Sequence, residues 1–246
     1  MKETDDTIDT VFDGRLAIVQ GRGGYRFSLD SVLLAHFAKP PGDGTIIDLG
    51  SGNGVIALMV AFLYPKARVV GLEIQRPMVK RAVRSMELNG MESRVEWVHG
   101  DVRAVERLFP SRSFDAVVCN PPYRIEASGR MNPDPEKRVA RHEVQGKLRD
   151  FLRAGAVLLR HGGKMAMIYP ATRMLDLLET MRQEGIEPKR LRVVHSSSGG
   201  EATLVLTEGI QEGRPGLKIL PPLVIYASGG DYTPELKSFL AGGATK

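Results

Sequence analysis

The strongest constraint on the fold is a regular alternation of strand-like and helix-like segments that begins at Thr45. Short β-branched apolar runs alternate with longer segments in which apolar residues recur at helical spacing. The expected strands are Thr45–Leu49, Arg68–Glu73, Val95–His99, Phe114–Cys119 and Lys164–Tyr169, and the expected helices are Asn53–Tyr64, Pro77–Asn89, Lys147–Arg160 and Arg173–Glu184. Because repeated βα units place parallel strands side by side with helices on both faces, the pattern predicts a doubly wound α/β fold.

The two ends of the chain depart from this alternation. Residues 1 to 10 have the composition of a frayed end, a strand or hairpin arm is expected around Arg15–Val19, and a helix is expected over Phe27–Ala38. Near the other end, Arg190–His195 and Thr203–Thr207 follow one another without an intervening helix, which predicts an antiparallel hairpin at one edge of the sheet. We therefore expect a mainly parallel, seven-stranded sheet with an antiparallel edge hairpin.

One domain is expected to span residues 1–246. Its predicted parts are an N-terminal segment over 1–44, a core over 45–210, and a C-terminal extension over 211–246. The extension contains a strand-like run at Leu223–Tyr226 and a last helix that is capped by Thr233. Nothing in the pattern indicates an internal repeat or an oligomeric state.

Charge and hydropathy exclude several classes of protein. The longest apolar run, Val55–Tyr64, is far shorter than the roughly 20 residues that span a bilayer, so no membrane insertion is expected. The first ten residues contain four acidic groups and no apolar stretch, which argues against a secretory signal and for a cytoplasmic protein. The net charge of +5 suits a polyanionic partner, although solubility alone also explains it.

A glycine-rich loop follows the first strand of the alternation, in the sequence Asp48-Leu49-Gly50-Ser51-Gly52-Asn53-Gly54. Glycines let the backbone approach a ligand closely, and the helix that follows offers N–H donors to an anionic group. The spacing G-x-G-x-G differs from the G-x-G-x-x-G of dinucleotide-binding folds. Glu73 and Asp101 follow the next two strands, so both are expected at the same edge of the sheet. Considered one at a time, these features have simpler explanations. The glycines can form a tight turn, Glu73 can be a solvated residue at the end of a strand, and Asp101 can cap the short helix that follows it.

Together, the acid, the glycine loop and the two later acids resemble the Rossmann-like methyltransferases that use S-adenosyl-L-methionine. This resemblance implies that Asp48 and the loop backbone hold the methionine part of the cofactor, Glu73 the ribose, and Asp101 the adenine amine. The expected cofactor site comprises Asp48, Gly50, Ser51, Gly52, Asn53, Gly54, Glu73, Ile74, Asp101, Val102 and Asn120, with Tyr25 and Phe27 from the N-terminal segment.

The fourth strand is followed by Asn120-Pro121-Pro122-Tyr123. The prolines cannot continue a ladder, so the strand must stop and leave Asn120 at its carboxyl end. This tetrapeptide resembles the catalytic site of amino-methyltransferases that act on planar nitrogens. The Asn120 side-chain oxygen and the Pro121 carbonyl can accept the two N–H bonds of an exocyclic amine, and Tyr123 can stack on its ring. The simpler alternative is a strand stop followed by a rigid turn.

Thiol and metal chemistry are not expected. Strand geometry points Cys119 and Asn120 to opposite faces, so Cys119 is expected to be a small buried residue rather than a nucleophile. The histidines show no metal-ligand spacing, and no metal is predicted. They are His36, His99, His142, His161 and His195.

Several stretches together resemble the bacterial tRNA adenine-N6 methyltransferase family, whose members modify the adenine 3′ of the anticodon in a valine tRNA. They are Tyr25–Ser31, Asp48–Gly54, Asn120–Tyr123, Ala140–Glu143, Pro221–Leu223 and Tyr232–Glu235. The resemblance implies transfer of a methyl group from S-adenosylmethionine to an adenine N6 in tRNA. It departs mildly from relatives at Asn53, where Ser or Thr is frequent, and at Glu73-Ile74-Gln75, where Glu-Leu-Asp is frequent.

RNA contacts are expected from the segment that leaves this site, which is either a solvated loop or a mobile lid on the RNA. Its basic residues are Arg124, Arg130, Lys137, Arg138 and Arg141. Two other methyltransferases share the Asn-Pro-Pro-Tyr chemistry, one acting on the glutamine amide of release factors and one on guanine N2 in ribosomal RNA. Outside this class, a nicotinamide dehydrogenase and a non-catalytic RNA-binding module remain as alternatives.

Overall fold

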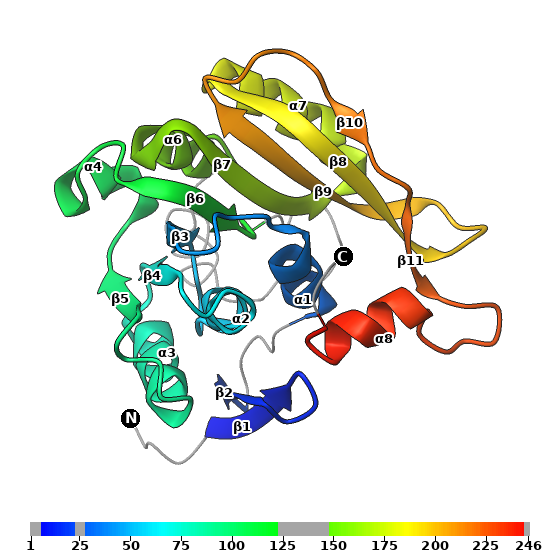
Figure 1. The fold of residues 1–246 in the computed structure, drawn as a ribbon, viewed down its shortest axis with the longest axis horizontal. Coiled ribbons are helices and arrows are strands. Elements are labelled where there is room, and N and C mark those ends of the chain that lie inside the picture. Colours follow the sequence, from blue (N-terminus) through cyan, green and yellow to red (C-terminus); the bar gives the residue numbers. More distant parts are fainter. Residues whose placement is uncertain (1–5, 23–27, 123–147, 244–246) are drawn as a thin grey trace, which may run out of the picture.

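Residues 6–22, 28–122 and 148–243 are described by the computed structural model, and they build a large sheet with helices on both faces (Figure 1). In chain order its strands are β3 (Thr45–Leu49), β4 (Arg68–Glu73), β5 (Val95–His99), β6 (Phe114–Cys119), β7 (Leu159–Pro170), β8 (Ile186–Ser197), β9 (Ala202–Gln211), β10 (Lys218–Ile219) and β11 (Leu223–Tyr226). Their spatial order is β10-β8-β9-β7-β6-β3-β4-β5, and β11 also pairs with β8. β9 runs antiparallel to its two neighbours, and the other pairs are parallel. The predicted mainly parallel α/β fold is confirmed.

The helices form two layers that sandwich the sheet (Figure 1). One layer contains α1 (Leu29–Phe37), α2 (Val55–Leu63), α3 (Arg76–Leu88) and α8 (Pro234–Leu240), and the other contains α4 (Val105–Leu108), α6 (Leu148–Leu158) and α7 (Met174–Gln183). Within the described ranges, no helix is long and apolar enough to cross a membrane.

Side chains of the central strand β3 alternate between two apolar cores, as the pleat of a strand requires. Ile46 packs in the core beneath α1 and α2, whereas Ile47 and Leu49 pack in the core beneath α6 and α7. Asp48 comes two residues after Ile46, and it is 1% exposed. The strand therefore carries one buried acid at its carboxyl end, where the glycine loop begins.

The N-terminal residues form a hairpin rather than a frayed end. β1 (Asp6–Val11) pairs antiparallel with β2 (Leu16–Gly21), and together they make a separate two-stranded sheet. β2 lies against α3, where the Val19 amide donates to Ser85 Oγ at 2.9 Å. The expectation of fraying over residues 1 to 10 is therefore wrong from Asp6 onward, because contacts with a distant helix order a polar strand.

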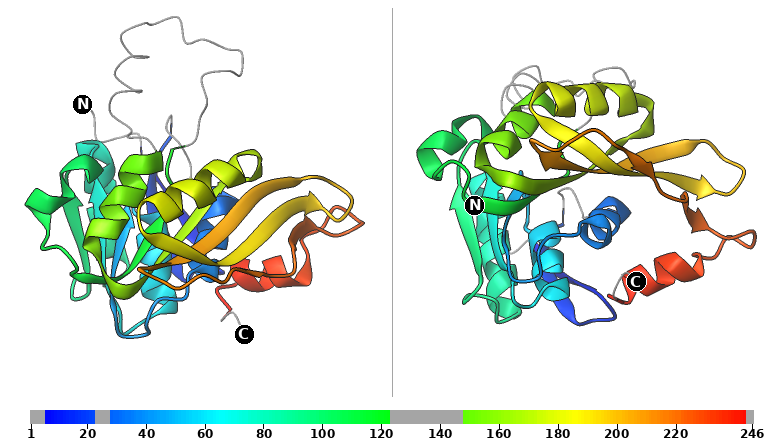
Figure 2. Two further views of the ribbon diagram at one scale, coloured as in Figure 1. Left: turned by 90° about the horizontal axis from the view of Figure 1, so that it is seen from above. Right: turned by 45° about the horizontal axis from the view of Figure 1, so that its top comes forward.

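The C-terminal extension adds two strands to the sheet, which has nine strands instead of the expected seven. β10 and β11 both run parallel to β8, with Leu223 opposite Val194. The β8–β9 hairpin is antiparallel as predicted, but β10 and β11 lie outside it, so β8 is not the free edge. Figure 2 shows this hairpin projecting from the body of the molecule, with the C-terminal segment returning beside it. A two-residue strand such as β10 has too few residues to show a periodic pattern.

Candidate active site

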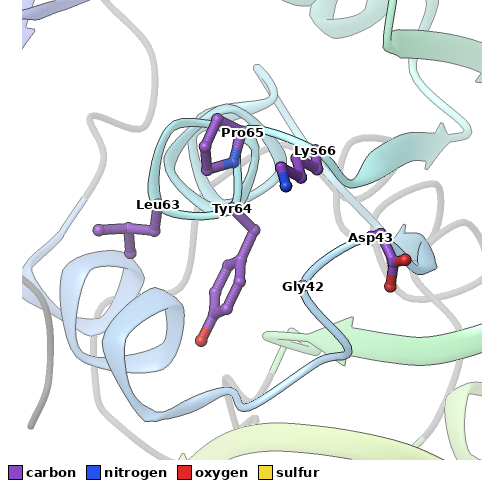
Figure 3. Close-up of a pocket in the computed structure, with 6 residues that line it drawn as sticks. All are labelled: Gly42, Asp43, Leu63, Tyr64, Pro65 and Lys66. Carbon is purple, nitrogen blue, oxygen red and sulfur yellow. The ribbon is translucent and has the colours of Figure 1, made fainter.

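A hollow on the surface lies at the amino ends of the strands, away from the glycine loop. It has a volume of about 430 Å³, and its lining comes from the turn before β3 and the turn after α2 (Figure 3). The lining residues are Gly42, Asp43, Leu63, Tyr64, Pro65 and Lys66. The Tyr64 hydroxyl donates to the Ala38 carbonyl at 3.0 Å. Because none of the predicted site residues lines this hollow, the candidate site lies at the opposite edge.

Strand register brings the predicted residues together at the carboxyl edge. Leu49 of β3 lies opposite Leu72 of β4 on one side and Cys119 of β6 on the other. Glu73 lies opposite His99 of β5. The residues that follow these positions are the glycine loop, Asn120, Ile74 and Asp101. Parallel strands that end in register therefore place four separate stretches of sequence side by side.

The glycine loop has a backbone that other residues rarely adopt. Gly50, Gly52 and Gly54 have φ angles of +72°, +57° and +85°. The Gly50 amide and the Ser51 amide both donate to the Leu72 carbonyl, at 2.9 and 3.0 Å. Since only glycine enters the left-handed region without a steric cost, the three glycines are needed for this turn.

The ring of Trp97, on β5, packs beneath the loop. A Cβ atom on Gly54 would lie 2.4 Å from Trp97 Cη2, and a Cβ on Gly71 would lie 2.1 Å from Trp97 Cζ3. Gly71 pairs with Trp97 across the two strands. Sequence reasoning missed Trp97, although a glycine inside a strand often marks such a close approach. The indole therefore supports the loop from below.

Asp48 is a buried carboxyl at the base of the loop. Its Oδ2 accepts from the Ala57 amide at 3.2 Å, and its Oδ1 has no partner in the described part of the chain. The pKa of Asp48 is raised to about 7, mainly by burial; the Ala57 hydrogen bond lowers it in part, and the negative charge of Glu73 adds to the rise. A cationic ligand group beside this carboxyl would favour its ionised form.

Glu73 ties the loop to the neighbouring strand. Its Oε2 accepts from the Gly52 amide at 2.9 Å, and its Oε1 accepts from the Gln75 amide at 2.8 Å. The side chain is 6% exposed. Each carboxylate oxygen keeps a further lone pair, so the acid can hold the loop and still accept from a ligand hydroxyl.

Asp101 caps the short 3₁₀ turn Val102–Ala104, which agrees with the simpler interpretation of this residue. Its Oδ1 accepts from the Arg103 amide at 2.9 Å, and Arg103 Nη2 lies 2.5 Å from its Oδ2. The hydrogen bonds with Arg103 lower the pKa of Asp101. Val102 is buried, and the Ile74 carbonyl accepts from His99 Nε2 at 2.9 Å. Arg103 is a further residue that sequence reasoning missed.

Asn120 stands directly after β6, and its side-chain oxygen is buried without a partner in the described residues. Pro121 is buried and Pro122 is exposed. Cys119 packs in the apolar core, where its thiol donates to the Leu49 carbonyl at 3.4 Å. Burial raises the pKa of the Cys119 thiol well above its ordinary value, so a thiolate nucleophile is disfavoured. The predicted buried role of Cys119 is confirmed.

Some predicted residues lie outside the described ranges. These are Tyr25, Phe27, Tyr123, Arg124, Arg130, Lys137, Arg138 and Arg141. Among the residues that the structure describes, no group of three or more His, Cys, Asp or Glu side chains could hold a metal ion. The absence of a metal requirement stays a prediction.

The site fits a ligand that carries several hydrogen-bond donors. Three buried oxygens around the loop have no partner within the described ranges: Asp48 Oδ1, Ser51 Oγ and Asn120 Oδ1. A buried polar atom without a hydrogen bond costs about 1–3 kcal/mol, so such atoms are usually paired in the working form of a protein. S-adenosylmethionine carries ammonium, hydroxyl and amine donors that suit Asp48 Oδ1 and Ser51 Oγ, and Asn120 Oδ1 remains for a donor from a second ligand.

Comparison with known proteins agrees with this chemistry. The model of the family "Methyltransferase small domain" matches residues 29–184. A tRNA1(Val) (adenine(37)-N6)-methyltransferase of Porphyromonas gingivalis is 30% identical over 233 residues, which cover 90% of this chain and 89% of the relative. A Vibrio cholerae protein of the same name is 29% identical over 172 residues, with 70% of each chain covered.

Among solved structures, a predicted O-methyltransferase of Agrobacterium tumefaciens, protein Atu636, superposes with a TM-score of 0.72. It is 25% identical, and the match covers 88% of this chain and 98% of that protein. A family model over most of the chain and a near full-length relative point to the same group. The chain therefore belongs to the methyltransferase small-domain family and, within it, to the family of bacterial tRNA1(Val) adenine-N6 methyltransferases.

Proposed function

We propose that this chain transfers a methyl group from S-adenosylmethionine to the exocyclic N6 amine of an adenine in tRNA, in the cytoplasm. The observation that carries the proposal is the buried, unpartnered oxygen of Asn120 at the edge where the glycine loop begins. A buried amide oxygen without a partner is available to accept a hydrogen bond from the substrate. The names of the relatives supply the tRNA and the adenine.

The cofactor is held by groups that the fold brings to the loop. Asp48 and Ser51 would accept hydrogen bonds from the amino-acid part of the cofactor, and Glu73 would accept hydrogen bonds from its ribose hydroxyls. Asp101 and Val102 would contact its adenine. When bound, S-adenosylmethionine supplies a methyl group on a positively charged sulfur. A cation also favours the ionised form of Asp48, whose pKa burial has raised to about 7.

The contribution of the protein itself is to position adenine N6, which is a weak nucleophile. The nitrogen lone pair of adenine N6 is delocalised into the ring. Asn120 Oδ1 and the Pro121 carbonyl accept the two N–H bonds, which fixes the nitrogen and favours a tetrahedral geometry at it. As the N–C bond forms, the C–S bond would break and S-adenosylhomocysteine would leave, so the positive charge would pass to the nitrogen. An N–H on that positively charged nitrogen is strongly acidic, so its proton leaves to one of these acceptors or to water without a dedicated base.

Mass spectrometry of nucleosides from tRNA incubated with the protein and S-adenosylmethionine tests this function. N6-methyladenosine is the expected product, and tRNA incubated without the cofactor is the control. If 2-methylguanosine appears instead, the guanine-N2 alternative is right and the adenine assignment is wrong. If only a release factor becomes methylated in a parallel reaction, the RNA assignment is wrong as a whole.

A further inference from the structure

Helix α3 presents a row of basic side chains that the chemistry of the site does not use. Arg76, Lys80 and Arg84 recur at every fourth residue, and all three are exposed. Residues four apart lie on the same side of a helix, and this row spans about 12 Å along the axis. Its first member comes three residues after Glu73, so the row begins at the edge that carries the cofactor loop. We call these three residues the α3 track.

The α3 track is unfavourable for the helix that carries it. Cations in a first helical turn oppose the helix dipole, and like charges four residues apart repel each other. The first turn of α3 contains Arg76 and no acid, and the acid of this helix, Glu87, stands in its last turn. A helix shaped by stability alone would carry the reverse distribution. The arrangement therefore indicates a partner that supplies the missing negative charge.

One neighbouring acid, Asp6, neutralises one end of the row and leaves the other end open. Asp6 of β1 pairs with Arg84 at 2.7 Å and with Arg81, the residue that follows Lys80, at 2.9 Å. Arg76 and Lys80 have no ion pair or side-chain hydrogen bond within the described chain. Figure 1 shows α3 between the β1–β2 hairpin and β5. The two unpaired cations are the ones nearest to the active site.

We propose that the α3 track binds the phosphate backbone of the RNA substrate and leads that backbone to the cofactor edge. The proposal rests on the proposed function, because it assumes that the target base belongs to a nucleic acid. A row of exposed cations suits phosphate contacts, which position an RNA without reading its sequence. The α3 track would hold the RNA strand next to the base that enters the active site.

A pair of double variants tests the track. Arg76→Gln with Lys80→Gln removes the two unpaired cations. Lys66→Gln with Arg68→Gln removes the same charge from exposed positions at the opposite edge, where Lys66 lines the hollow of Figure 3. Fluorescence anisotropy with unmodified tRNA between 50 and 200 mM salt gives the affinity and its salt dependence. Calorimetry with S-adenosylmethionine checks that both variants keep a folded cofactor site.

We expect the α3 double variant to bind tRNA roughly ten-fold more weakly, and the slope of log affinity against log salt to shrink by about two. The control variant should match the wild-type protein in both quantities. Equal losses in the two variants would mean a general charge effect and overturn the track. Unchanged binding in the α3 variant, with wild-type protein that forms N6-methyladenosine, also overturns the track and leaves the proposed function standing. If the α3 double variant binds tRNA more weakly but the wild-type protein forms no N6-methyladenosine, the proposed function is wrong and the proposed role of the α3 track in RNA binding stands.

Discussion

At the residue scale, Asn120 differs from the adjacent Cys119 because its side-chain oxygen is buried without a hydrogen-bond partner among the described residues. Asn120 Oδ1 lies at the carboxyl edge of the sheet, whereas the thiol of Cys119 packs in the apolar core and donates to the Leu49 carbonyl. The two adjacent side chains thus have different surroundings, as the alternation of side chains at the end of a strand predicts. This contrast offers a matched pair of substitutions.

Asn120→Ala should lower turnover by roughly 10²- to 10³-fold, the usual cost of removing one preorganised polar group from a transition state. Cofactor affinity should change little, because the proposed partner of the Asn120 oxygen is the substrate amine. Single-turnover assays and calorimetry measure the two quantities separately. Cys119→Ala is the control and should keep turnover within a few-fold. Near-normal turnover of Asn120→Ala would reject the amine-positioning mechanism.

At the scale of elements, the β3–α2 loop depends on a side chain from a strand two places away. Trp97 of β5 fills the space above Gly71 of β4 and reaches Gly54 of the loop. The loop is also held by Glu73, which accepts from the Gly52 amide. The glycine loop therefore has a support built from two neighbouring strands, and its geometry follows from their packing.

Gly71→Ala should disturb this support. A Cβ atom there would lie 2.1 Å from Trp97 Cζ3, so the indole or the strand must shift. Overpacking of this kind costs roughly 1–3 kcal/mol of stability, and we expect weaker cofactor binding as well. Thermal unfolding and calorimetry measure the two effects. Gly199→Ala, at a glycine with open space, should behave like the wild type. Adding Trp97→Leu to Gly71→Ala should restore part of the stability, and failure to do so would mean that the indole is not the obstacle.

The alternation of strands and helices could be predicted from the sequence because hydrophobic periodicity is a local property. The positions of Asp48, Glu73 and Asn120 at strand ends were predictable for the same reason. The support by Trp97 was not, because it depends on the register between β4 and β5. The ion pair between Arg103 and Asp101 depends on side-chain rotamers, which the sequence does not specify. The hairpin strand β1 needs a partner 75 residues away, since Asp6 pairs with Arg81.

At the scale of the whole molecule, the N-terminal hairpin and the C-terminal extension lie on different sides of the central strands. β1, β2 and α3 flank the loop on one side through Asp6 and Val19, while the C-terminal extension closes the far end of the sheet through β10 and β11. Between them lies the buried acid Asp48. Burying an ionisable group couples the stability of the entire fold to pH.

The sign of this coupling follows from the pKa of Asp48, which is raised from 3.8 to about 7 in the folded state. Below pH 4 the group is protonated in both states and carries no penalty. Between pH 4 and 7 the unfolded chain loses this proton while the folded chain keeps it, so the contribution of Asp48 to stability falls as pH rises. The lowered pKa of Asp101 acts with the opposite sign and at lower pH.

Asp48→Asn should therefore gain stability relative to the wild type as pH increases. The amide oxygen can still accept from the Ala57 N–H, but it does not titrate. Urea unfolding of cofactor-free protein at pH 5.0 and 7.5 measures the difference between variant and wild type, which should grow by something on the order of 2 kcal/mol. Asp43→Asn removes an exposed acid and should leave the pH dependence of stability at the wild-type level. If Asp48→Asn also follows the wild type at both pH values, then the Asp48 carboxyl ionises in the folded chain as readily as in the unfolded one, and a cationic ligand is not needed to charge it.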